Sequence, residues 1–224
     1  MKVLYGVNSK IPLNRKLKNG YTVYEWIVRQ KGVPSFCFRT LCGEDGITEE
    51  EIKFLQNKNC KLGIVIRNLK EKDISSCHGD REALNAICDF ESLNLKIDKK
   101  IAIFAEINKD YSINHNWMIS FAQTLSMNGY VPAFIANTDS SKNFNFDRQC
   151  SHFVDATKEV GEFGAIYCAT EPKISSKPEE WSPFCPSSLN VTDVDFWMCG
   201  ETKIIDTLVD DIYCKNLNAL DKML

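Results

Sequence analysis

The chain has 224 residues, 44% of them hydrophobic, which is enough to bury a full core as one domain over residues 1–224. Its 27 basic and 30 acidic residues give a formal net charge of −3, and they form no dense basic block. This balance excludes the electrostatic footprint of a nucleic-acid-binding protein and of a protein held on an anionic membrane. No apolar run approaches the length of a transmembrane helix.

Ten cysteines are scattered along the chain without a Cys-x-x-Cys motif, which favours reduced, buried thiols over a disulfide framework. Four of them lie within apolar strand or helix patterns and are expected to be buried: Cys37, Cys88, Cys168 and Cys199. The three histidines show no ligand spacing, so we expect neither a metal site nor a cofactor.

Apolar strand-like runs alternate with amphipathic segments through the first half of the chain. One helix is expected to begin with a capping box, in which Thr48 and Glu51 each bond the backbone amide of the other. In chain order we predict a strand at 2–8, a helix at 21–28 ending at Gly32, a strand at 34–39, a helix at 48–59, a strand at 62–67 and a helix at 79–93.

The run at 101–108 is the most informative strand candidate, because it is apolar yet ends in a carboxylate and an amide. Side chains alternate faces along a strand, so Phe104, Glu106 and Asn108 should share one face. Burying a glutamate at the end of such a strand costs free energy unless the carboxylate is paired or used. The C-terminal ends of barrel strands are where catalytic residues gather, so Glu106 is the leading catalytic candidate.

The second half continues the alternation less regularly. Prolines at four positions between 171 and 190 predict a long loop there. The predicted elements are a helix at 113–128 closed by Gly129, a strand at 130–136, a helix or strand or both within 143–158, a strand at 163–169, a strand at 194–199, and then a short extended pair and a C-terminal helix.

Near-continuous apolar strands separated by helices predict a parallel sheet covered by helices. Six to eight such strands in one domain favour a TIM-like (β/α) barrel, with some helices missing in the second half. A doubly wound open sheet is the alternative, but no Gly-rich phosphate loop follows the first strand.

A series of different short motifs is spread over nearly the whole chain: Gly6-Val7-Asn8-Ser9, Phe38-Arg39-Thr40, Ile47-Thr48-Glu49-Glu50-Glu51, Gly79-Asp80 with Ala83 and Ala86, Ile103-Phe104-Ala105-Glu106-Ile107-Asn108, Asn128-Gly129-Tyr130 with Phe134, and Val194-Asp195-Phe196-Trp197. In this order and spacing they resemble the glycoside-hydrolase-like domain of unknown function DUF1906. That family is related to the family 25 lysozymes and has a TIM-barrel-like fold. The resemblance implies a glycan as substrate or ligand.

The chain departs from the lysozyme pattern at the residues that matter most. Asn8 stands where lysozyme relatives carry an acid on the first strand, and Asn108 stands where the fourth strand would end in Asp. Ordinary glycoside hydrolysis needs two carboxylates, and an amide can replace neither. A substrate-assisted route needs one: Glu106 would be the general acid, and Asn8 or Asn108 would hold the acetamido group that acts as nucleophile.

Other polar or aromatic residues near strand ends are candidates for binding the glycan. Trp181 and Trp197 could stack on a sugar face, although a tryptophan in an apolar strand is usually core. Arginines in the mouth would favour the charged form of Glu106, which opposes a general-acid role. The candidate substrate-binding residues are Asn8, Arg39, Arg67, Asn108, Asn137, Asp139, Glu171 and Trp197.

Each of these residues also has a structural interpretation. Glu106 paired with Arg39 or Arg67 would only hold the barrel closed. Asparagines at strand ends commonly act as hydrogen-bonding caps, and acidic residues in loops are usually solvated. The Glu49-Glu50-Glu51 run complements a helix dipole and is not expected to form a site.

Two hypotheses follow. The first is a lysozyme-like glycoside hydrolase acting on an N-acetylated cell-wall glycan of the peptidoglycan type, with Glu106 as general acid. The second is an inactive barrel that binds carbohydrate or a protein partner after loss of the second carboxylate. Residues 1–8 contain too short an apolar run for a signal peptide. We therefore expect a protein that is cytoplasmic as synthesised, with release by lysis or by a dedicated export route.

Overall fold

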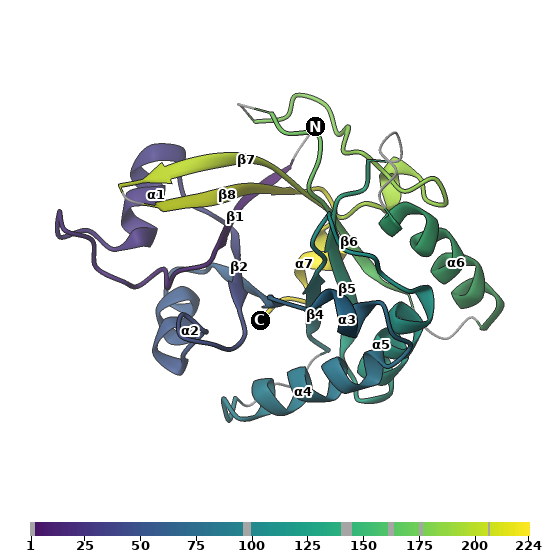
Figure 1. The fold of residues 1–224 in the computed structure, drawn as a ribbon. Helices are drawn as coiled ribbons and strands as arrows, with labels where there is room; N and C mark the ends of the chain where they lie inside the picture. The colour runs from purple at the N-terminus through teal and green to yellow at the C-terminus, as the bar shows by residue number, and fades with distance from the viewer. Residues whose placement is uncertain (1–2, 96–99, 140–144, 161–163, 175–176, 206) are drawn as a thin grey trace.

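The computed structural model describes residues 3–95, 100–139, 145–160, 164–174, 177–205 and 207–224. Eight strands close into a barrel in sequence order (Figure 1). Neighbours from β1 to β7 are parallel, whereas β8 runs antiparallel to both β7 and β1. The strands are β1 (Leu4–Ser9), β2 (Phe36–Thr40), β3 (Lys61–Ile66), β4 (Ala102–Glu106), β5 (Val131–Ala136), β6 (Ile166–Ala169), β7 (Phe196–Ile204) and β8 (Thr207–Cys214).

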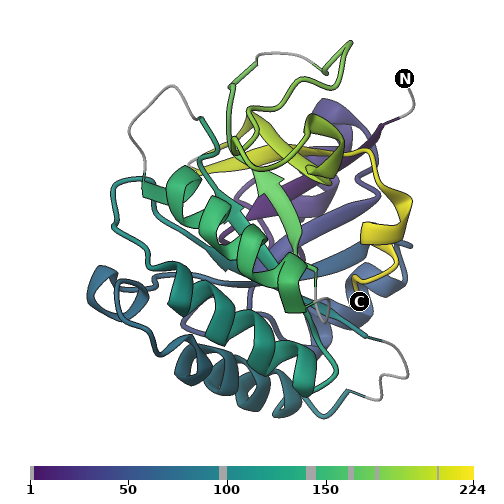
Figure 2. The ribbon, with the colours of Figure 1, turned by 90° about the vertical axis from the view of Figure 1, so that its right-hand side faces the viewer.

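Helices follow the first five strands, and α4, α5 and α6 lie side by side on the outside of the barrel (Figure 2). Within the described residues only the short η1 (Val191–Asp193) lies between β6 and β7. A closed α/β barrel is therefore confirmed, with helices that alternate with strands only loosely. The helices are α1 (Val23–Lys31), α2 (Glu49–Gln56), α3 (Glu71–Ile74), α4 (Gly79–Glu91), α5 (His115–Met127), α6 (Asn145–Val160) and α7 (Leu217–Leu220).

Phenylalanine rings fill the inside of the barrel. Phe38 on β2 is the centre of this group: its ring centroid lies 4.5 Å from that of Phe104, 5.2 Å from Phe196 and 5.9 Å from Phe36. All four side chains are fully buried. Burial of one such side chain stabilises the folded state by roughly 1.5–3 kcal/mol, so these rings form the floor on which the barrel mouth is built.

Two glycines make room for these rings. A Cβ atom on Gly6 would lie 2.5 Å from the ring of Phe36, and one on Gly63 would lie 2.4 Å from the ring of Phe38. Both distances are below any tolerable contact between carbon atoms. The strands β1 and β3 can therefore pass the aromatic layer only because glycine stands at these inward positions.

The C-terminal segment closes the opposite end of the barrel from the mouth. Leu224 and Leu62 exchange backbone hydrogen bonds of 2.8 and 2.9 Å, which pair the chain end with the start of β3. The backbone amide of Ala102 donates to the carbonyl of Lys222 at 2.7 Å. Met223 is fully buried in the interior cluster, so this end is plugged by side chains and offers no second opening among the described residues.

Most predicted elements are present, and three expectations needed correction or refinement. Of the ambiguous stretch 143–158, residues 145–158 belong to the helix α6, and residues 143–144 lie outside the described residues. The expected short extended pair is a long hairpin of β7 and β8. The helix α3 was not predicted. The capping box at Thr48 forms only by half: Thr48 Oγ1 accepts from the Glu51 amide at 3.2 Å, whereas the Glu51 side chain turns inward to Arg39.

The cysteines are free thiols, as expected, but one burial prediction was wrong. Cys88 is exposed, because α4 turns Ala83, Ala86, Ile87 and Phe90 toward the barrel and leaves position 88 outward. Burial raises the pKa of the Cys150 and Cys199 thiols to about 12, so neither forms a reactive thiolate at neutral pH.

Thiol accessibility gives a direct test of this fold. At pH 8 the native protein should react quickly with a chromogenic disulfide reagent at its three exposed thiols, Cys42, Cys77 and Cys88. The six buried thiols should react only after unfolding, because the reagent cannot enter the core and burial disfavours the charged thiolate. Rapid native titration of most of the ten cysteines would contradict the described packing.

Candidate functional site

Strand alternation places a polar layer directly above the aromatic floor. On β4 the side chains of Ala102 and Phe104 belong to the interior cluster, and Glu106 is the next inward position at the mouth. On β3 the same alternation carries Val65 inside and brings Arg67, just past the strand end, over the same opening. The predicted shared face of Phe104 and Glu106 is therefore confirmed.

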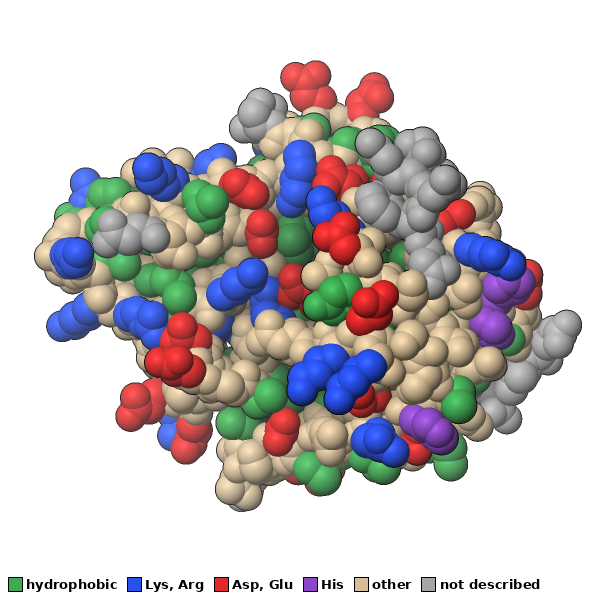
Figure 3. All heavy atoms as spheres, in the orientation of Figure 1, with side chains coloured by type: hydrophobic (Ala, Val, Ile, Leu, Met, Phe, Trp, Pro, Cys, Tyr) green, Lys and Arg blue, Asp and Glu red, His purple; other side chains and the backbone are tan. Residues whose placement is uncertain are grey.

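The mouth holds a pocket of about 680 Å³. Charged side chains of both signs lie across the middle of this face of the molecule (Figure 3). Seven strands contribute inward positions to its lining, at or just past the strand end for β2 to β6 and within the strand for β7 and β8: Thr40, Arg67, Glu106, Asn137, Thr170, Met198 and Asp210.

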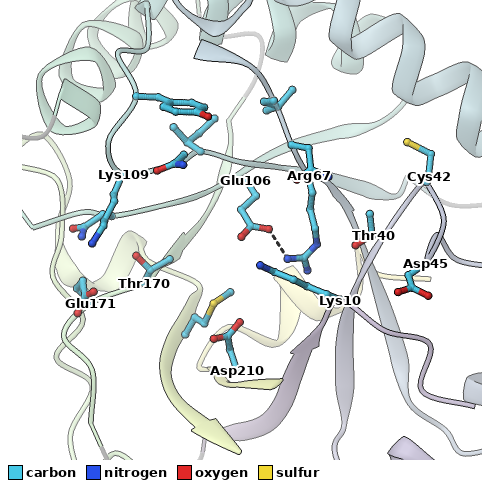
Figure 4. A pocket seen from close by; sticks show the side chains of 18 of the residues that line it. Lys10, Thr40, Cys42, Asp45, Arg67, Glu106, Lys109, Thr170, Glu171 and Asp210 are labelled. Carbon is cyan, nitrogen blue, oxygen red and sulfur yellow. Dashed lines mark hydrogen bonds and ion pairs between the residues drawn. The ribbon is translucent and has the colours of Figure 1, made fainter. Parts of the chain in front are cut away.

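A chain of hydrogen bonds joins two carboxylates across this pocket, and Figure 4 marks its link between Arg67 and Glu106. Arg67 NH1 donates to Glu106 Oε2 at 2.6 Å, and Arg67 NH2 donates to Asn8 Oδ1. Asn8 Nδ2 in turn donates to Asp210 Oδ2 at 2.8 Å. The Arg67 side chain is only 5% exposed, whereas that of Glu106 is 31% exposed, so the glutamate is the member that a ligand can reach.

Arg67 is an unusually constrained cation. Its burial lowers the pKa of the guanidinium from the ordinary value, and the neighbouring charges of Glu106 and Asp210 raise it again. Its Nε atom is buried and has no hydrogen-bond partner among the described residues. The guanidinium is thus bonded to one carboxylate and one amide oxygen, and its charge offsets that of Glu106 inside the pocket.

Asp210 is a site residue that the sequence analysis missed. It lies on β8, where the antiparallel register places it opposite Asn8 of β1. The segment Thr207–Cys214 does carry a strand-like signal, since β-branched and aromatic residues surround a pair of aspartates. Alternation along that strand would turn one aspartate of the pair inward, and in the structure it is Asp210.

Several predicted substrate-binding residues do meet at this pocket. Arg67, Asn108, Asn137 and Glu171 line it together with Glu106, and Asn8 lies behind Arg67. Two of them have local bonds typical of turns: Asn108 Oδ1 accepts from the Asp110 amide at 3.0 Å, and Glu171 Oε2 accepts from the Lys173 amide at 3.1 Å.

Arg39 does not line the pocket, contrary to expectation. Its side chain points to the outer side of β2 and is fully buried against α2, because Phe36 and Phe38 take the inward positions of that strand. Arg39 Nε donates to Glu51 Oε1 at 2.7 Å, and NH2 donates to Glu51 Oε2 at 3.1 Å. The carboxylate expected to serve only the helix dipole is thus the partner of a buried ion pair.

Trp197, Trp181 and Asp139 also lie away from the pocket lining. Trp197 is 1% exposed, its Nε1 donates to the Pro172 carbonyl at 3.1 Å, and its ring meets that of Trp181 edge-on at 5.9 Å. Asp139 is buried, and its amide donates to Asn137 Oδ1 at 2.9 Å. These two tryptophans therefore belong to the outer core, as the structural interpretation of an apolar-strand tryptophan proposed.

Within the described part of the chain, no group of three or more histidine, cysteine or acidic side chains is arranged to hold a metal ion. Over the same residues, no helix is both long and apolar enough to cross a membrane. The chemistry of the site has to be argued from the carboxylates, the amides and the arginine that the barrel brings together.

No family model and no curated protein matches this sequence. Solved structures do. An uncharacterized protein of B. stearothermophilus superposes with a TM-score of 0.79 at 22% identity, over 99% of this chain and 100% of that one.

Two weaker structural matches involve secreted or lytic proteins. The Tat-secreted protein Rv2525c of Mycobacterium tuberculosis gives a TM-score of 0.57 at 12% identity over 96% of this chain and 95% of that one. The spore cortex lytic enzyme SleM of Clostridium perfringens gives 0.54 at 11% identity, over 99% of this chain and 69% of that one. The barrel shares its fold with a cell-wall lytic enzyme. At these identities the likeness establishes the fold alone.

The buried ion pair behind the pocket can be tested by unfolding. Replacing Glu51 by Gln leaves the Arg39 charge buried without compensation, which should lower the free energy of unfolding by about 3–5 kcal/mol. Urea denaturation of the purified variant measures this directly. Replacing both residues, in Arg39→Met/Glu51→Leu, should cost less than Glu51→Gln alone, because no charge is then left buried.

Glu50→Gln is the matched control, since Glu50 is the exposed neighbour on the same helix turn. Its loss should cost less than about 1 kcal/mol, the usual size of a helix-dipole contribution. Equal destabilisation by the two glutamine variants would show that the buried pair contributes nothing special.

Proposed function

We propose that this chain is a TIM-like, glycoside-hydrolase-like barrel of the DUF1906 type that hydrolyses an N-acetylated cell-wall glycan of the peptidoglycan type. The observation that carries the proposal is the pair of carboxylates, Glu106 and Asp210, which face one pocket from β4 and β8. In barrel order these strands lie on opposite sides, so a sugar bound across the mouth would pass between the two groups.

The sequence raises one chemical objection to hydrolysis: the reaction needs two carboxylates, and an amide replaces the second acid of the fourth strand. A second carboxylate in the pocket meets this objection. In glycoside hydrolysis one carboxyl protonates the leaving oxygen while the second acts as nucleophile or base. Glu106, the more accessible of the ion-paired groups, is proposed as the general acid. Asp210 is proposed as the second carboxylate, and Asn8 Nδ2 donates a hydrogen bond to it.

A general acid must carry a proton, and the ion pair with Arg67 opposes this because a guanidinium stabilises the carboxylate form. We propose that the bound glycan separates Glu106 from Arg67 before proton transfer. The N-acetyl group of the substrate offers a further nucleophile, as in substrate-assisted hydrolysis, and we propose that Asn108, which lines the pocket, contacts it.

The alternative function is glycan binding without hydrolysis. The 2.6 Å contact between Arg67 and Glu106 favours this alternative, because the proposed general acid is already engaged in an ion pair. Under this alternative the pocket would keep its polar lining for recognition, and neither carboxylate would need to change protonation.

The two functions are separated by measuring release of reducing ends from peptidoglycan and from chitooligosaccharides. We expect turnover by the wild-type protein, a loss of about 10²–10⁴-fold in Glu106→Gln and a comparable loss in Asp210→Asn. The first variant removes the proton donor, and the second removes the charge that faces the developing cation.

Glu49→Gln is the control for this assay, because Glu49 is exposed on α2 and forms its ion pair with Lys53 of the same helix. It should leave turnover unchanged. Absence of turnover by the wild-type protein on both substrates would reject hydrolysis, and saturable binding of the same glycans would then support the binding alternative.

A further inference from the structure

Part of one edge of β7 is left without a neighbouring strand. β7 pairs with β6 only at Phe196 and Trp197, whereas its pairing with β8 continues to the last residue of the strand. The loop after β6 follows this edge as far as Cys199, whose carbonyl accepts from the Ile174 amide at 2.6 Å. In Figure 1 β7 forms the outer side of the hairpin, and β8 lies between it and β1. Beyond Cys199, residues 200–204 therefore form a free edge with respect to the described part of the chain.

The hydrogen-bonding direction of each strand can be followed from β2 around to this edge. The Ser35 amide donates to the Tyr5 carbonyl, so Tyr5 directs its backbone groups toward β2. Backbone direction alternates along a strand, so Asn8 directs its groups toward β8. Asn8 lies opposite Asp210 in the antiparallel register, so Asp210 is bonded to β1 and the adjacent Val209 is bonded to β7.

The same alternation identifies the unpaired backbone groups of β7. Val209 lies opposite Thr202, so Thr202 is the β7 residue that is bonded to β8. Its neighbours Glu201 and Lys203 therefore turn their N–H and C=O groups to the free edge. Both side chains are exposed, and neither forms an ion pair with a residue in the described part of the chain. An edge of this kind is a template for a further extended strand.

The charges along this edge are unfavourable within a single chain. Glu201 lies directly opposite Asp210 on β8, and like charges at opposed positions of an antiparallel pair destabilise the sheet. Lys203 shares the same face and lies opposite Leu208, whose side chain is 55% exposed. A cation that approaches Glu201 across the free edge would offset the repulsion, and a carboxylate that approaches Lys203 would neutralise the second position.

We infer that this edge of β7 pairs with the same edge of a second copy of the chain, antiparallel and with the two-fold axis at Thr202. In that register Glu201 of each chain lies opposite Lys203 of the other, so both facing pairs are opposite in sign. The free N–H and C=O groups of the same residues then complete each other across the axis. Sliding the strands by two residues would oppose two glutamates or two lysines, so the charges select one register.

The contact is small and closed. Few residues of β7 take part, far fewer than a permanent interface uses, so the dimer is weak and depends on protein concentration. A two-fold contact uses the same edge of both chains, so association stops at two copies. Charged edge residues normally prevent pairing with unrelated strands, and here they also specify the partner. The inference goes beyond the proposed function and does not depend on it.

Sedimentation equilibrium at low ionic strength tests the dimer, with protein from about 10 μM to about 1 mM, the range of weak association. The mass of the wild-type protein should rise from that of one chain toward that of two. Lys203→Glu and Glu201→Lys each replace both attractive pairs by repulsive ones, so each should weaken dimerisation at least about tenfold. The double variant Glu201→Lys/Lys203→Glu exchanges the charges and should restore the dissociation constant to within about threefold of wild type.

Mixing the two single variants separates the loss of charge pairing from misfolding. Every facing pair in the mixed dimer is again opposite in sign, so an equimolar mixture should dimerise although neither variant does so alone. Lys72→Glu is the matched control, because it reverses the same charge at an exposed position on α3 and should leave association unchanged. Hydrogen exchange gives a second measurement: the Glu201 and Lys203 amides should be protected at high protein concentration and exchange quickly at low concentration.

The inference is overturned if the wild-type protein stays monomeric over the whole concentration range. It is equally overturned if a dimer forms that neither charge reversal weakens, or if the double variant associates as poorly as the single ones. A dimer in which the Glu201 and Lys203 amides gain no protection would use another surface and would also reject it.

Discussion

The buried pair of Arg39 and Glu51 is the contact on which the pocket wall depends. Besides the paired charges, Arg39 NH1 donates to the Ser9 carbonyl at 2.9 Å and NH2 donates to the Asp45 carbonyl at 2.7 Å, while Glu51 Oε1 accepts from the Leu13 amide at 2.7 Å. One ion pair therefore joins the end of β1, the loop after β2 and the first turn of α2. These further hydrogen bonds offset the cost of burying the two charges.

Arg67 repeats this arrangement on the inside of the barrel with a different result. Arg39 is the fourth residue of β2 and faces outward, whereas Arg67 follows β3 and faces the mouth. The outer arginine meets backbone carbonyls and one carboxylate, which makes a fixed scaffold. The inner arginine instead meets the side chains of Glu106 and Asn8 at the pocket, and its Nε has no hydrogen-bond partner among the described residues.

Arrangements within one strand of this site could be predicted from the sequence, whereas contacts between strands far apart in the sequence could not. Phe104 and Glu106 were placed on one face correctly, because alternation within a strand is a local property. Asp210 could not be placed, because its position depends on a register with Asn8 across 202 residues and on an antiparallel strand that ordinary β/α alternation does not predict. Arg39 was misplaced because both arginines end apolar runs, whereas in the β2–β3 register Arg39 lies opposite Ile64, three residues before Arg67, and an odd offset puts the two side chains on opposite faces.

The antiparallel closure also explains how the mouth of this barrel holds two carboxylates although its fourth strand supplies only one. A parallel strand presents its mouth residues from its C-terminal end, so the eighth strand of a regular barrel would contribute its last residues. Here β8 enters at the mouth and brings residues near its beginning, including Asp210, to the level of Asn8. The reversed strand supplies a carboxylate across the pocket from Glu106, and Asn8 Nδ2 donates a hydrogen bond to it. Loss of an acid from one strand is therefore no measure of how many acids the mouth contains.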